Sequence, residues 1–326
     1  MNPRGTRKIG PGLQSFSRKI GQAVLVMLLV SIAVFFAVRM IPGNPARDVL
    51  GNRATPAAVA ALKRRLGLDR PLLEQFLTFL KGVPTANFGH SLVEEGVTVR
   101  YIVFNGLGIT ASVVAASTIL SLVIGVPLGL WAALARHRQR LVSNVVQSVA
   151  VVLLAAPPFL IGLLLIFFLA VEVRVFPVAG WGSGFGSDMA HLALPAIALS
   201  GYLIPLVVRT VRQAALDASS ELFVEAAIAR GISSRSIMYK HILPNSLLPL
   251  ITLIGLNVGT LLSGAIVIEA VFALPGLGTA LYQAVDALDY TVLEGVAIVA
   301  AFAVVVANLS ADALYMVADP RVRRKS

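Results

Sequence analysis

Three long runs without any Asp, Glu, Lys or Arg constrain this chain more than any other feature of its sequence. They cover residues 105–135, 141–171 and 242–268. An α-helix rises about 1.5 Å per residue, so roughly 20 apolar residues cross the hydrocarbon core of a bilayer. Each run is therefore long enough to span a membrane. The whole chain has 57% hydrophobic and 13% charged residues with a mean hydropathy of +0.85, values typical of a polytopic membrane protein.

Six segments qualify as transmembrane helices or nearly so, and we expect an all-α membrane protein with six spans. The fourth segment is the least apolar because it contains His191, Pro195 and Pro205. Proline is tolerated inside a span where neighbouring helices satisfy the freed carbonyl groups, so this pattern indicates kinked helices in a bundle. The predicted spans are residues 20–41, 105–135, 142–171, 189–208, 247–269 and 293–316.

The positions of Lys and Arg predict the orientation of these spans. Basic residues cluster before the first span, in RHRQR at 136–140, between the fourth and fifth spans, and in the RVRRKS tail. The only Lys or Arg in residues 172–188 is Arg174, and residues 270–292 contain neither Lys nor Arg. Because these residues are enriched in cytoplasmic loops, both termini are predicted to be cytoplasmic. The net charge of +11 is then a topology signal, and nucleic acid is not an expected partner.

The spans divide the chain into predicted parts. The first span follows basic residues as a secretory signal does, but no small-x-small cleavage site follows it, so we expect it to be retained. The parts are a cytoplasmic N-terminal segment (1–19), the first transmembrane helix (20–41), an external helical subdomain (42–104), a five-helix core (105–316) with a cytoplasmic loop (209–246), and a basic cytoplasmic tail (317–326).

Helix boundary signals are clear in the external subdomain. Thr55 and Pro56 predict the start of one helix, because Thr is a cap residue and proline suits the first helical position. Gly67 predicts the end of that helix, and Pro71 predicts the start of a second one.

Residue types needed for metal binding or catalysis are scarce. The absence of cysteine excludes disulfides and thiolate metal sites, and the four histidines lie far apart in the sequence. No lysine follows the glycine of a GxxxxGK[ST] motif, so the chain has no P-loop for nucleotide phosphates. An intramembrane protease needs a Ser with a His, or paired Asp residues, inside the bundle, and only His191 falls in a predicted span. We expect no metal, no cofactor and no enzymatic activity on this chain.

The stretch EAAIARGISSRSIMYKHILPN, residues 225–245, is polar and basic although apolar segments flank it. Residues 216–230 form a predicted helix with Asp217 or Ser219 as its cap and Gly231 as its left-handed end. The predicted apolar face of this helix comprises Leu222, Phe223, Ala226 and Ala229.

A second predicted helix starts at Ser233 or Ser234 and has Pro244 at a kink or at the entry to the fifth span. Its predicted apolar stripe comprises Ile237, Met238, His241 and Ile242. A DNA-binding helix-turn-helix is disfavoured, because a module tied to the membrane at both ends cannot easily enter a major groove. Two hypotheses stay open at this point: an amphipathic loop at the lipid surface, and a helix that sits in a groove of a cytoplasmic partner.

The order of residues in this stretch resembles the EAA motif of permease subunits in bacterial ABC importers, a loop that contacts the ATPase subunit in that family. The ATPase-coupling residues implied by the resemblance are Glu225, Ala226, Ala227, Gly231, Ile242, Leu243 and Pro244. His241 departs from the pattern, since the family has an apolar residue there. The segments RMIPGNP, LGLDRPLLEQF, FPVAGW, HLALPAIAL, VIEAVFALPGLG and DALYMVADPRVR resemble, in order, the peptide and nickel permease branch.

This resemblance implies a type I ABC importer permease fold in the bacterial plasma (inner) membrane. The implied partners are a homologous second permease, two ABC ATPase subunits that bind ATP and magnesium, an extracytoplasmic solute-binding protein and the lipid bilayer. Di- or oligopeptide is the expected cargo, moved by alternating access, with nickel and glutathione as alternatives. The same six spans also suit a stand-alone secondary transporter or channel.

We make a separate prediction for each of two charged residues near span ends, Glu269 and Arg39. An acidic residue near a span is costly unless it is paired or hydrated. Glu269, at the end of the fifth span, is therefore a candidate for a gate or for an external contact. The alternative is that Glu269 lies in the headgroup region and pairs with a local partner. Arg39 is expected to extend its guanidinium to the outer interface.

Overall fold

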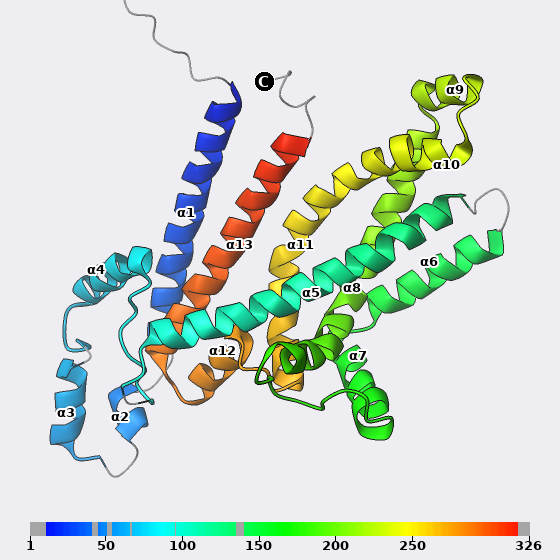
Figure 1. The fold of residues 1–326 in the computed structure, drawn as a ribbon. Helices are drawn as coiled ribbons and strands as arrows, with labels where there is room; N and C mark the ends of the chain where they lie inside the picture. Colours follow the sequence, from blue (N-terminus) through cyan, green and yellow to red (C-terminus); the bar gives the residue numbers. More distant parts are fainter. Residues whose placement is uncertain are drawn as a thin grey trace, which may run out of the picture.

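Five helices of the computed structural model are long and apolar enough to cross a membrane, and a bent pair supplies a sixth candidate. The structure describes residues 11–40, 45–50, 54–65, 67–94, 96–134 and 140–318. Its regular elements are helices, apart from an isolated bridge between His90 and Thr98. These findings confirm an all-α protein with five to six spans (Figure 1). The long helices are α1 (Pro11–Arg39), α5 (Val99–Leu134), α8 (Phe185–Ser219), the continuous series α10 (Ser234–Ile237), η3 (Met238–Ile242) and α11 (Leu243–Val271), and α13 (Tyr290–Ala318).

The predicted third span is a bent pair, which corrects the expectation of one helix over 142–171. α6 (Arg140–Ala155) is followed by α7 (Pro158–Leu165) and the π-helical η2 (Ile166–Glu172), and the two halves of the span meet at 97°. Pro157 has an extended backbone with φ −60° and ψ 135°. Consecutive prolines remove two backbone donors and disfavour helix in the residue before each of them. Single prolines, such as Pro127 in α5, stay inside their helices.

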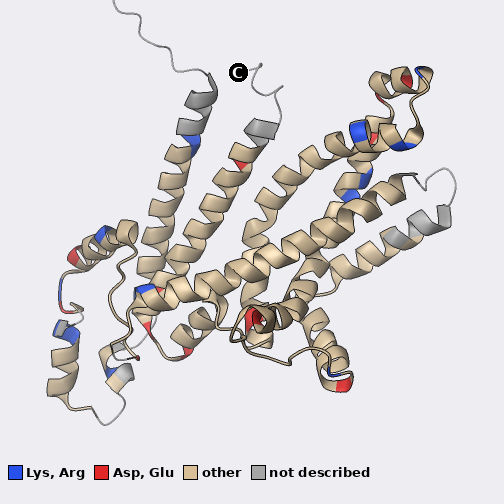
Figure 2. Cartoon of the chain, in the orientation of Figure 1, with Lys and Arg blue, Asp and Glu red and all other residues tan. Residues whose placement is uncertain are grey.

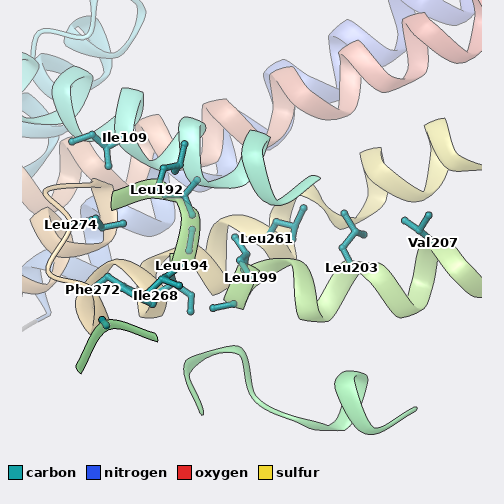
Figure 3. Close-up of a cluster of buried hydrophobic side chains, with 14 of the residues drawn as sticks. Ile109, Leu192, Leu194, Leu199, Leu203, Val207, Leu261, Ile268, Phe272 and Leu274 are labelled. Atoms are coloured by element: carbon teal, nitrogen blue, oxygen red, sulfur yellow. The ribbon is translucent and has the colours of Figure 1, made fainter. Parts of the chain in front are cut away.

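The span with the weakest apolar signal is the most buried one. In α8, 67% of the span window is buried, against 11 to 33% in the other long helices. α5 approaches α8 through Gly125 and Gly129, where an added Cβ would overlap Val207 and Val211. This small-residue spacing lets two helix backbones come close. Because protein surrounds α8, its sequence does not have to be uniformly apolar (Figure 3).

Short helices form the segment between α1 and α5. Ala58 donates its N–H to Thr55 Oγ1 at 3.3 Å, and Gly67 has a φ of +67°. Pro71 directly precedes α4, so these predicted boundaries are confirmed. The elements are α2 (Pro45–Leu50), α3 (Pro56–Arg65), α4 (Leu72–Gly82) and the 3-10 turn η1 (Val83–Thr85).

The start of α1, the end of α13 and the short helix α9 (Leu222–Ala229) lie at one end of the bundle, which we call the inner end (Figure 1). α2, α3 and α12 (Leu277–Asp286) lie at the opposite, outer end. Figure 2 shows charged residues gathered at the two ends and long uncharged stretches between them. This arrangement agrees with the predicted common side of the termini and the 209–246 loop. Most of the basic tail 317–326, residues 1–10 of the N-terminal segment and most of RHRQR lie outside the described residues.

Candidate coupling surface

The segment predicted as a cytoplasmic loop is largely helical. α8 continues through Ser219, and α9 begins only at Leu222. Asp217 and Ser219 therefore lie inside α8, and the prediction that one of them caps the next helix was wrong. Glu221 instead precedes α9, with an extended backbone. α8 extends beyond its predicted end because a buried row, Val211, Ala215 and Ala218, gives it a packed face there.

Gly231 ends α9 in the predicted left-handed conformation, with a φ of +72°. Gly231 donates its N–H to the carbonyl of Ile228 at 2.9 Å, and Ile232 donates to the carbonyl of Ala227 at 3.1 Å. This pair of bonds is the Schellman arrangement, which satisfies carbonyls that the helix end leaves free. Among the described residues, no heavy atom would lie within 4 Å of a Cβ added at Gly231. The need for glycine comes from the backbone and not from lack of space.

The chain then enters the long helix that contains α11. Ser233 caps this helix by accepting the N–H of Ser236 at 3.4 Å, as predicted. η3 is a π-helical turn just before Pro244, and such turns accommodate a residue that cannot donate a backbone bond. Asn245 and Ser246 donate their side chains to the carbonyls of His241 and Ile242. The helix is therefore continuous from Ser234 to Val271 despite the proline.

The inner face of α9 differs from the one predicted. Val224 and Ala227 are buried, whereas the predicted face, which includes Leu222 and Phe223, is exposed. Long-range contacts decide the orientation, because α9 packs on the inner ends of α8 and of the α10–α11 helix. The buried cluster comprises Ala133, Ala215, Ala218, Val224, Ala227, Ile237, Met238 and Ile242.

Large apolar side chains cover the outward face of α9. Leu222 is 78% exposed, Ile228 62% and Phe223 40%. The Phe223 ring lies 6.2 Å from that of His241, the position at which this sequence departs from the EAA motif. Glu225 is exposed in the first turn of α9, where a negative charge is favourable to the helix dipole. An apolar patch at a polar end of a membrane protein is typical of an interaction surface.

The seven residues predicted for ATPase coupling fall into two groups. One group is exposed and comprises Glu225, Ala226, Gly231 and Pro244. The other supports the helix from within: Ala227 and Ile242 are buried, and Leu243 is half-buried. Ala227 is therefore not part of the outward surface that the EAA resemblance suggested, and it packs in the buried cluster instead.

Glu269 lies at the outer end of α11 and is fully buried. Thr110 Oγ1 donates to one carboxylate oxygen at 2.6 Å, and the N–H of Gly278 donates to the other at 2.7 Å. The N–H of Leu277 donates in turn to Thr110 Oγ1 at 2.9 Å. These bonds join α5, α11 and α12. The side chain of Glu269 presents no atom to an external partner in this structure, and a role in a gate stays a prediction.

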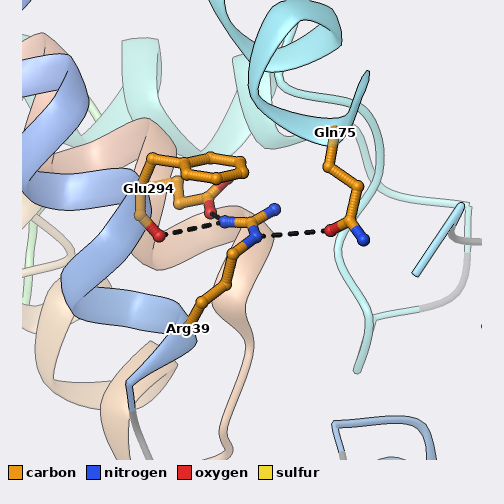
Figure 4. Close-up of polar contacts among 4 residues, drawn as sticks. Arg39, Gln75 and Glu294 are labelled. Carbon is orange, nitrogen blue, oxygen red and sulfur yellow. Dashed lines mark hydrogen bonds and ion pairs between the residues drawn. The ribbon is translucent and has the colours of Figure 1, made fainter. Parts of the chain in front are cut away.

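A second outer contact was missed by the sequence analysis. Arg39 donates to Glu294 of α13, to Gln75 of α4 at 3.3 Å and to the carbonyl of Phe35 at 3.2 Å (Figure 4). Its guanidinium also stacks on the Phe35 ring, 3.3 Å from the centroid. The guanidinium is thus held by a carboxylate 255 residues away, and its predicted place at the outer interface stays a prediction. Nothing local in the sequence points to that pairing.

Comparison with known proteins gives consistent matches along the chain. Residues 125–324 match the family described as binding-protein-dependent transport system inner membrane component, and residues 13–96 match its N-terminal component. A probable peptide ABC transporter permease of Sinorhizobium fredii is 33% identical, over 94% of this chain and 98% of that protein. The dipeptide transport system permease DppB of Escherichia coli K12 is 31% identical, over 96% of this chain and 99% of that protein.

A solved structure shares the fold. The inward-facing MetNI methionine ABC transporter contains a chain that aligns with a TM-score of 0.56 at 22% identity, over 67% of this chain and 97% of that one. The relatives that align over nearly their full length and the family match together identify the family. The chain belongs to the binding-protein-dependent transport system inner membrane component family and is a multi-pass permease subunit of an ABC transporter in the inner membrane.

Proposed function

We propose that this chain is a permease subunit of an importer for di- or oligopeptides, coupled through α9 to an ATPase. The observation that supports coupling most directly is the two-sided character of α9. Val224 and Ala227 fix one side to the bundle, while Leu222, Phe223 and Ile228 leave an apolar surface on the other. A cytoplasmic ATPase subunit that covers these three side chains would gain about 1.5–3 kcal/mol for each one that is fully buried.

The packing around α9 gives the ATPase contact a route into the membrane. α9 touches the inner ends of α8 and of the α10–α11 helix through one apolar cluster. Both helices then continue across the bundle without a chain break, to Phe185 and to Val271. A displacement of α9 therefore moves two spans together, as alternating access requires.

The proposed assembly contains a second, homologous permease, two ATPase subunits and an extracytoplasmic solute-binding protein. The chain has no P-loop, so ATP and magnesium would bind to the ATPase subunits. The peptide cargo rests on relatives named as dipeptide or peptide permeases that align over nearly the full length.

Reconstitution tests this proposal. The purified complex in vesicles is expected to accumulate a radiolabelled dipeptide only with ATP and the binding protein. Uptake by this chain alone without ATP would instead support a secondary transporter or channel. Mass spectrometry of ligands that co-purify with the binding protein tests the cargo, and nickel or glutathione in place of peptide would overturn that part.

A further inference from the structure

α4 is fixed to the outer end of α1 by ring contacts and one polar bond. The Phe76 ring lies 5.1 Å from that of Phe35 and 6.1 Å from that of Phe36. Gln75 of α4 accepts a hydrogen bond from Arg39 Nε at 3.3 Å. The position of α4 relative to the α1 span is therefore fixed by these contacts.

The position of these contacts along α1 places α4 at the membrane boundary. The apolar span of α1 ends at Arg39. Phe35 and Phe36 precede Arg39 by about one helical turn, which is about 4.5–6 Å along the axis. Amphipathic helices that lie in a membrane surface insert about 5–10 Å into the boundary between headgroups and acyl chains. α4 is held at this depth.

The sequence of α4 forms three faces at helical spacing. Phe76 and Phe79 face α1. Leu73 and Leu77, four residues apart, are 69% and 46% exposed on the adjoining face. The third face is polar and exposed, and it comprises Glu74, Thr78 and Lys81.

The leucine face continues an apolar surface of α1. Only 11% of the α1 span window is buried within the chain, and Phe36 is 45% exposed beside Phe76. A leucine row that adjoins such a surface at the depth of the acyl boundary has lipid as its natural neighbour. Glu74 and Lys81 balance each other in charge, so the polar face does not require anionic lipid.

We propose that α4 is an interfacial membrane helix, with Leu73 and Leu77 in the acyl boundary of the outer leaflet and Thr78 toward water. The subdomain between α1 and α5 is then anchored to lipid along one side and to α1, through Gln75 and Arg39, along the other. This anchoring holds whatever the cargo is, and its test does not use transport as a readout.

Site-directed spin labelling tests the proposal, because the chain contains no cysteine. Leu73→Cys, Leu77→Cys and Thr78→Cys are labelled in the assembled transporter, with any cysteines of partner subunits replaced, in vesicles of zwitterionic lipid. Power saturation then compares collisions with oxygen, which concentrates in lipid, and with a water-soluble nickel chelate. Leu29→Cys on α1, at an exposed position deeper in the span, supplies a lipid reference.

The labels at positions 73 and 77 are expected to have an oxygen-to-nickel ratio several-fold above that at position 78, and a shallower depth than the label at position 29. Equal ratios at positions 77 and 78 would mean that water covers the leucines. Immobile labels shielded from both agents would mean that a protein partner covers them. Either outcome overturns the proposal.

Discussion

The inner and outer ends of this bundle are held together by different kinds of contact. At the inner end, α9 rests on apolar residues, and Lys19 and Asp312 form an ion pair whose side chains are 35% and 43% exposed. At the outer end, buried polar groups join the helices: Glu269 with Thr110 and Gly278, and Arg39 with Glu294. Apolar contacts tolerate small shifts, whereas hydrogen bonds demand fixed distances and angles. The inner end is thus suited to a partner that moves it, and the outer end to holding one geometry.

Removal of the buried carboxylate should have the largest effect. Glu269→Ala leaves the N–H of Gly278 without its acceptor and takes a hydrogen-bond partner from Thr110 in a buried site, at a cost of about 1–3 kcal/mol for each group. We expect a clear fall in the melting temperature of the purified complex and loss of transport.

Glu269→Gln is the matched control. Its amide oxygen can accept from Gly278, and its NH₂ group can donate to Thr110, which still has the carbonyl of Gly106 as an acceptor at 3.0 Å. Stability should therefore stay near that of the wild type. If Gln and Ala variants melted alike, the hydrogen-bond network would not be what holds the outer end.

A change in the α9 turn should disturb the inner end without weakening the outer one. Gly231→Val forces a β-branched residue to a φ of +72°, which costs about 1–3 kcal/mol of backbone strain. We expect membrane insertion to persist while ATPase activity stimulated by the binding protein falls. Gly231→Asn, which tolerates the left-handed region, should retain more of this stimulation. Equal stimulation in the Val variant would argue against the need for this turn.

The two faces of α9 can be separated by a pair of substitutions. Ile228→Ser removes an exposed apolar side chain, so the permease should keep its stability while its association with the ATPase weakens by about tenfold, or 1.4 kcal/mol. Ala227→Leu overfills the buried cluster and should destabilise the loop by about 1–3 kcal/mol. Binding of detergent-solubilised permease to the ATPase, alongside thermal melting, measures both. Weaker binding with lower stability for Ile228→Ser would contradict this division.

The inner ion pair should matter least. Lys19→Gln breaks the contact with Asp312, but exposed pairs contribute only about 0–1 kcal/mol. The melting temperature should barely change. The change should be smaller still at high salt, because screening already weakens the wild-type pair. A loss comparable to that of Glu269→Ala would remove the distinction between the two ends.

Several local signals in the sequence predicted local features correctly, although the predicted cap at Asp217 or Ser219 was wrong. The apolar runs located the spans, and Thr55, Gly67, Gly231 and Ser233 marked helix boundaries through their own backbone and side-chain chemistry. The break at Pro157 also had a local signal, two consecutive prolines, which the length of the surrounding apolar run obscured.

Features that depend on distant partners could not be predicted. The inward side of α9 is chosen by the ends of α8 and α10, so its own apolar residues gave the wrong face. The contact of Asp289 with Ser91 joins residues 198 apart, and no spacing rule links them. The same holds for Arg39 and Glu294, whose pairing exists only because α1 and α13 lie side by side.

The length of the helix from Ser234 to Val271 sets a scale for motion in this protein. Its 38 residues extend about 57 Å at 1.5 Å per residue, nearly twice the thickness of the hydrocarbon core. If it turns as a rigid rod about one end, a tilt of about 5° displaces the other end by about 5 Å. A movement of that size separates groups that are in van der Waals contact. A small rotation imposed at Ile237 would therefore reach the outer end of the helix, at Ala270, as a displacement of this size.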